Sequence, residues 1–133
     1  MKVIDTTVIA AYILKEPGWE KLADLLMHAV TVDMAIKESL NAVWKTYARG
    51  RISEESAKAK AKALLELAKS GLEIVDEKTL LKRAFEISCS ENLSVYDALF
   101  LALAESKDAL LYTLDEEQAE KAKKLAIRVK VIE

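Results

Sequence analysis

The chain has 133 residues, a length that fits one domain spanning residues 1–133 and that hides about two thirds of the unfolded surface, so no disulfides are required. Its 20 basic and 22 acidic side chains give a net charge of -2, which excludes a uniformly basic nucleic-acid coat and a disordered polyelectrolyte. One cysteine and one histidine exclude a Cys/His zinc site, which needs four ligands, and catalysis by a pair of imidazoles.

No targeting or membrane segment is predicted. The first residues, Met1–Asp5, include an acid where a signal peptide needs apolar side chains. The longest apolar runs, Val8–Leu14 and Ala98–Ala104, are too short to cross a bilayer. We therefore expect a cytoplasmic protein in a reducing compartment, with no membrane partner. Abundant Lys and Glu with few amide side chains indicate a thermophilic source, because charged networks become less costly at high temperature.

Five short segments, rich in β-branched or other apolar residues, predict strands. In chain order they are Lys2–Ile4, Ala29–Val32, Leu72–Val75, Leu110–Thr113 and Arg128–Ile132. The segments between them have apolar residues three and four apart, which is typical of helices. Strands that alternate with helices predict an α/β protein, a three-layer α/β/α sandwich around a central parallel five-stranded sheet.

Glycine and proline mark the expected ends of the helices. Pro17-Gly18 is expected to end the helix that follows the first strand, and Gly50 to separate the two helices between the second and third strands. Gly71 is expected to close the second of these helices before the third strand. No linker, repeat or second domain interrupts this pattern.

Four acids lie where such a sheet would bind a ligand. Asp5 follows the first strand and Asp115 follows the fourth, so both should lie beyond the carboxyl ends of parallel strands. Asp97 lies in the first turn of the helix before the fourth strand. Glu38 lies early in the helix after the second strand, with Asn41 on the same face. The four acids could therefore meet in one cleft.

Local chemistry offers a second interpretation of each acid. Asp5 and Asp115 are good helix N-caps, and both Ser94-x-x-Asp97 and Asp115-Glu116-Glu117-Gln118 resemble capping boxes. Glu38 could belong to a solvated face, opposite an apolar stripe. That stripe is predicted to consist of Ile36, Leu40, Val43 and Tyr47. Local sequence leaves these alternatives open.

Taken together, four stretches of the sequence resemble the signature segments of the PIN-domain family. They are Val3–Ile9, Glu38–Val43, Ser94–Ala104 and Tyr112–Asp115. They occur in the family's order and cover essentially the whole chain. Within the family, this short form resembles the VapC-type toxin of toxin–antitoxin pairs.

The resemblance implies the strand order 3-2-1-4-5 and an endoribonuclease that hydrolyses RNA phosphodiesters with Mg²⁺ or Mn²⁺. Its metal-site and catalytic acids would be Asp5, Glu38, Asp97 and Asp115. It also implies an antitoxin protein as partner and a homodimer. The alternative is a PIN-like binding module with weak catalysis or none.

A hard divalent cation would relieve the repulsion of four carboxylates, and Mg²⁺ prefers oxygen ligands and keeps several waters. We expect Asp5 and Asp97 to bind the metal directly, with Asp115 and Glu38 orienting waters or holding a second ion. Hydroxyl and amide groups near these acids are candidates to orient them, or to make ordinary turn and cap bonds. These are Thr6, Thr7, Thr113 and Asn41.

RNA must approach this acidic site, so cations should lie beside it. Residues 41–70 carry seven basic and three acidic side chains, a net charge of +4 within a chain of -2. Lys45 and Arg49 continue the helix face of Glu38 and are predicted to hold phosphates near the metal.

Overall fold

A five-stranded parallel sheet forms the centre of the computed structural model, which describes residues 1–133. The order of its strands is β3-β2-β1-β4-β5, as predicted. The strands are β1 (Lys2–Ile4), β2 (Val30–Val32), β3 (Glu73–Val75), β4 (Leu110–Thr113) and β5 (Val129–Val131). Three of them, β2, β3 and β5, are shorter than the apolar runs suggested, although the flanking residues Ala29, Arg128 and Ile132 still make backbone hydrogen bonds to the neighbouring strands. The order reverses between β1 and β4, the place where open α/β sheets bind ligands.

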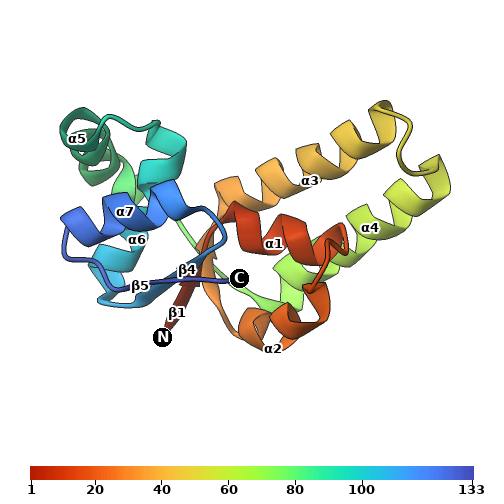
Figure 1. Ribbon diagram of the computed structural model, residues 1–133, viewed down its shortest axis with the longest axis horizontal. Helices are drawn as coiled ribbons and strands as arrows, with labels where there is room; N and C mark the ends of the chain where they lie inside the picture. The colour runs from red at the N-terminus through yellow and green to blue at the C-terminus, as the bar shows by residue number, and fades with distance from the viewer.

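Helices cover both faces of the sheet and give the predicted three layers (Figure 1). The first face carries α1 (Thr6–Ile13), α2 (Ala23–Leu26), α3 (Asp33–Ala48) and α4 (Glu54–Glu66), with the short turns η1 (Trp19–Leu22) and η2 (Leu67–Gly71). The second face carries η3 (Glu77–Leu80), α5 (Leu81–Glu91), α6 (Val95–Lys107) and α7 (Glu116–Lys124). Figure 1 shows α3 and α4 side by side as an arm that projects from the sheet.

The first helix ends earlier than the glycine and proline pattern indicated. Leu14 caps α1, and Lys15 takes a left-handed backbone conformation with φ of 55°. The amide of Glu16 then bonds back to the carbonyl of Ala11 at 3.0 Å. This C-terminal motif is usually built on glycine, so a lysine in that role hid the helix end from sequence reasoning.

The apolar stripe predicted for α3 is partly wrong. Its buried residues are Ala35, Ile36, Ser39 and Val43. Leu40 and Tyr47 are exposed, because the outer half of α3 packs against α4 in the projecting arm rather than against the sheet. Exposed apolar side chains on a helix are not decisive by themselves, since much of any protein surface is apolar.

Helix α6 is the central helix of the core. Every residue from Ala98 to Ala104 is buried, and α6 packs against β1, β2 and β4. A helix that is apolar all round must be enclosed on all sides. Ser94 caps its first turn, where Asp97 lies, so burial of α6 fixes the position of that acid beside the sheet. No helix of the structure has the length and hydropathy needed to cross a membrane.

Candidate active site

Asp5 is a buried carboxylate at the meeting point of β1 and β4. The pairing of Ile4 with Tyr112 places Asp5 beside Thr113. Thr113 donates its hydroxyl to Asp5 Oδ2 at 2.5 Å, while Oδ1 accepts from the amide of Thr7 at 3.1 Å and from its hydroxyl. Only 4% of Asp5 is exposed. The predicted capping role and the buried site therefore coexist in one side chain.

Thr7 and Thr113 form a hydroxyl network that joins the ends of the two strands. Thr7 Oγ1 accepts from the amide of Leu114 at 2.9 Å, and Thr113 Oγ1 accepts from the amide of Asp115 at 3.0 Å. Each threonine thus donates to Asp5 and accepts from the backbone beyond β4. The network fixes the Asp5 carboxylate relative to the turn that carries Asp115.

Burial raises the pKa of Asp5 from its ordinary value of 3.8 to about 6, against the hydrogen bonds from Thr113 and Thr7, which lower it. The low-dielectric surroundings disfavour the charged form, and no positive side chain donates a hydrogen bond to this carboxylate. A bound cation would supply the missing positive charge.

The raised pKa predicts that the metal-free protein loses stability as pH rises. Because the folded state holds its Asp5 proton up to about pH 6 and the unfolded state only to about 3.8, the stabilisation is complete below pH 4 and is lost through pH 6. The full difference is about 3 kcal/mol. Urea unfolding in EDTA at pH 4.5 and pH 7.5 measures about two thirds of it, because part of the stabilisation is already lost at pH 4.5. Asp5→Asn should remove most of this contribution, and an unchanged pH dependence in the variant would contradict the assignment.

Glu38 is held by a threonine of α1. Thr6 Oγ1 donates to Glu38 Oε1 at 2.5 Å, which brings the half-buried Glu38 side chain to the residue next to Asp5. The solvated-face interpretation therefore does not describe Glu38. The expected help from Asn41 is absent, because Asn41 is exposed and makes no side-chain hydrogen bond. The orienting hydroxyl belongs to Thr6 instead.

Asp97 and Asp115 lie together in a separate pocket of about 180 Å³. Its lining residues are Asn92, Leu93, Ser94, Asp97, Asp115, Glu117, Gln118 and Lys121. Burial, followed by the nearby charges of Asp115 and Glu117, raises the pKa of Asp97, while the bond with Ser94 opposes this. Asp115 Oδ1 caps α7 by accepting from the amides of Glu117 at 2.9 Å and Gln118 at 3.5 Å. The second oxygen of Asp115 makes no hydrogen bond.

Lys45 and Arg49 point into solvent from the arm and form no ion pair with an acid. Their charges are therefore available to an anion. In contrast, Lys58 pairs with Glu54 at 3.2 Å on α4, so that part of the basic segment is a solvated helix face.

Sequence reasoning missed Glu117, Gln118 and Lys121 as members of the pocket. A usable signal was present, because residues two, three and six positions after a helix-capping acid lie in the first two turns of its helix. In the sequence, Gln118 is visible only as part of a capping pattern. Its side chain instead donates to the backbone carbonyl of Asp97 at 2.9 Å.

The oxygen atoms of the acidic side chains are suitable ligands for a hard divalent cation, but their positions match a metal site only partly. The ligands on offer are carboxylate oxygens, and buried Asp5 lacks a counter-charge. No group of three or more Asp, Glu, His or Cys side chains is gathered closely enough to hold a metal ion. Mg²⁺ commonly keeps several waters and binds through one or two carboxylates, so it does not require such a cage. The residues therefore fit a hydrated ion shared between side chains.

These features define an α/β protein with an acidic site at the switch point between β1 and β4. Residues 2–124 match the PIN domain, and the chain belongs to this family. Ribonuclease VapC3 from Pyrobaculum aerophilum is 34% identical over 122 residues, which are 90% of this chain and 92% of that protein. The chain is thus a homologue of a VapC ribonuclease, as the signature segments indicated.

Solved structures confirm the fold. The crystal structure of PAE2754 from Pyrobaculum aerophilum has a TM-score of 0.69 at 24% identity, covering 90% of this chain and 84% of that one. VapBC2 from Rickettsia felis, bound to a DNA fragment from its promoter, gives a TM-score of 0.69 at 16% identity, with 98% and 97% covered. At these identities the likeness concerns the fold alone.

Proposed function

We propose that this protein is an endoribonuclease that hydrolyses RNA phosphodiesters with the help of Mg²⁺ or Mn²⁺. The observation that carries the proposal is the buried Asp5 carboxylate, which lies at the switch point of a PIN-family sheet with no positive partner. The ribonuclease name of a relative with 34% identity supports the choice of reaction. Acids that merely cap helices would not need to be buried in this way.

In the proposed reaction, Asp5 and Asp97 would hold the cation, while Asp115 and Glu38 would orient waters or hold a second ion. A bound divalent cation lowers the pKa of water and neutralises charge on the attacked phosphate. Thr7 and Thr113 keep the Asp5 carboxylate in one orientation through their hydroxyls. Thr6 does the same for Glu38. Lys45 and Arg49 hold phosphates of the RNA chain on the face of α3.

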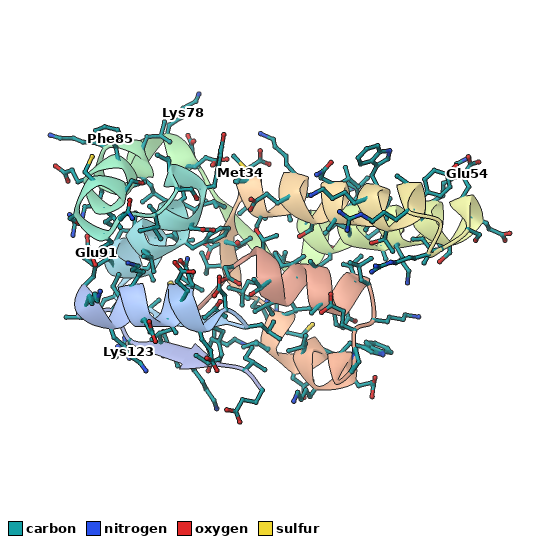
Figure 2. All side chains as sticks on the ribbon, turned by 45° about the horizontal axis from the view of Figure 1, so that its top comes forward. Met34, Glu54, Lys78, Phe85, Glu91 and Lys123 are labelled. Carbon is teal, nitrogen blue, oxygen red and sulfur yellow. The ribbon has the colours of Figure 1, made fainter.

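We further propose that the protein is a toxin held inactive by an antitoxin protein, that it forms a homodimer, and that it is cytoplasmic. The relationship to VapC3 and the likeness to VapBC2 support the first of these. Phe85 points outward from α5, where Figure 2 labels it, and is 62% exposed, so a partner protein could reach it. The thermophilic source stays a prediction.

Cleavage of a total RNA pool tests the reaction directly. We expect cleavage with Mg²⁺ or Mn²⁺, and none in EDTA. The same ions should raise Tm, because a ligand that binds only the folded state stabilises it by about 2.7 kcal/mol at a hundredfold excess over Kd. Absence of both effects in the folded wild-type protein would overturn the proposal.

The absence of a gathered three-carboxylate group is the observation that favours the second candidate, a PIN-like binding module with weak catalysis or none. This module would bind RNA or protein equally well in EDTA. RNA binding that is independent of metal, without cleavage products, would support it over the nuclease.

A further inference from the structure

Gln118 joins the two helices that carry the acids of the pocket. It lies in the first turn of α7, three residues after Asp115, and only 4% of it is exposed. Its backbone amide lies 3.5 Å from Asp115 Oδ1, and its side-chain Nε2 donates to the carbonyl of Asp97 at 2.9 Å. Among the side-chain hydrogen bonds of the protein, this last one is the bond that links α7 to α6.

The orientation of the amide follows from its partner. A backbone carbonyl only accepts, so the NH₂ group of Gln118 must face Asp97. The carbonyl oxygen of the Gln118 amide has no donor within the protein and is free to accept from water in the pocket. A neutral amide is suited to this position, because a charged side chain would change the electrostatic repulsion between the carboxylates of Asp97 and Asp115.

The acids of the pocket lie at the first turns of two different helices. Asp97, Asp115 and Glu117 place three negative side chains around the same pocket and Lys121 places one positive side chain there, so the negative charges outnumber the positive one and repel one another. Both α6 and α7 present their N-terminal turns here, so a small rotation of either helix would change the distance between the acids. The hydrogen bond from Gln118 acts directly on the residue that carries one of them.

We propose that Gln118 is a positioning residue that sets the spacing of Asp97 and Asp115 for a divalent cation. The proposal rests on the proposed function, since it assumes that these acids bind metal. Groups that orient metal ligands typically change metal affinity or activity by about 10 to 100-fold when they are removed. Gln118 would act through Asp97 and would not touch the reacting phosphate.

Gln118→Met tests the proposal, because methionine keeps the length and volume of glutamine and removes the donor. We expect the Mn²⁺ concentration that gives half of the Tm increase to rise about tenfold or more, with kcat falling and KM for RNA little changed. Tm in EDTA should change by less than about 4 °C, because the Asp97 carbonyl keeps its helical hydrogen bond. A purely structural role would instead lower Tm in EDTA and leave the Mn²⁺ midpoint unchanged.

Two further variants make the test decisive. Gln118→Asn keeps the amide, but its side chain is one methylene too short to reach the Asp97 carbonyl, so we expect it to behave like Gln118→Met. If Gln118→Met does not fold, Gln118→Asn serves as the test in its place. Lys124→Met, on an exposed position of the same helix, should match the wild type. Wild-type Mn²⁺ midpoints and kcat in both Gln118 variants would overturn the positioning role while leaving the nuclease intact. A wild-type protein with neither Mn²⁺ stabilisation nor cleavage would overturn the proposed function itself.

Discussion

We expect Asp5→Asn to reduce kcat/KM for RNA cleavage by about 10³-fold or more, equivalent to about 4 kcal/mol of transition-state stabilisation. The reason is that asparagine keeps the size of the side chain and its place among Thr7 and Thr113 but loses the negative charge that attracts the cation. Cleavage of a fluorescent RNA at saturating Mn²⁺ measures the loss. The Mn²⁺-induced increase in Tm should disappear in the same variant.

The matched control is Asp24→Asn, which makes the same change on the exposed surface of α2, away from the site. It should keep wild-type cleavage and the wild-type response to Mn²⁺. In EDTA at pH 7.5, Asp5→Asn should be more stable than the wild type, because it no longer buries a charge. Loss of cleavage accompanied by a lower Tm in EDTA would indicate misfolding and would contradict the assigned role.

We expect Phe100→Ala to lower the free energy of unfolding by about 3 to 5 kcal/mol, a large part of the 5 to 15 kcal/mol typical of a domain. Phe100 is among the largest fully buried side chains of the protein and lies in the seven-residue buried run of α6. Its removal leaves a cavity beneath the helix whose first turn carries Asp97. Urea unfolding followed by the fluorescence of Trp19 and Trp44 gives the change.

Phe85→Ala provides the control, since Phe85 is the other phenylalanine of the chain and is 62% exposed on α5. Measured at protein concentrations low enough to prevent association, it should change the free energy of unfolding by less than about 0.5 kcal/mol. Similar losses for the two variants would mean that α6 is not the centre of the core.

Most of the fold was predictable from patterns within the chain. Alternating β-branched and helical segments indicated a parallel sheet, and the signature segments implied its strand order, which the structure confirms. The helix end at Lys15 and the exposure of Leu40 and Tyr47 were not predictable in the same way. The helix end depends on a lysine that takes the left-handed conformation usual for glycine. The exposure of Leu40 and Tyr47 depends on the arm formed by α3 and α4, which projects from the sheet. Neither feature leaves a periodic signal.

The candidate site shows the same division. The pairing of β1 with β4 places Asp5 beside Thr113. The hydroxyls of Thr7 and Thr113 donate hydrogen bonds to the Asp5 carboxylate, as expected from the sequence. Spacing along the chain could not show that Glu38 is held by Thr6 rather than Asn41. It also could not show that the acids form a buried carboxylate and a separate pocket, without a gathered group of three. Those facts depend on side-chain directions in three dimensions.

By itself, the sequence determined the class of this protein: the alternation of elements, the position of an acid after β1 and β4, and the oxygen-rich chemistry of the site. Only the tertiary structure decided how much each acid is buried, and therefore which of them has a raised pKa, because desolvation is a sum over neighbours from distant parts of the chain. It also decided the role of Gln118, whose partner lies 21 residues away in sequence. Periodicity records which face of a helix is buried, whereas the hydrogen bond between α6 and α7 exists only after both helices have packed on the sheet.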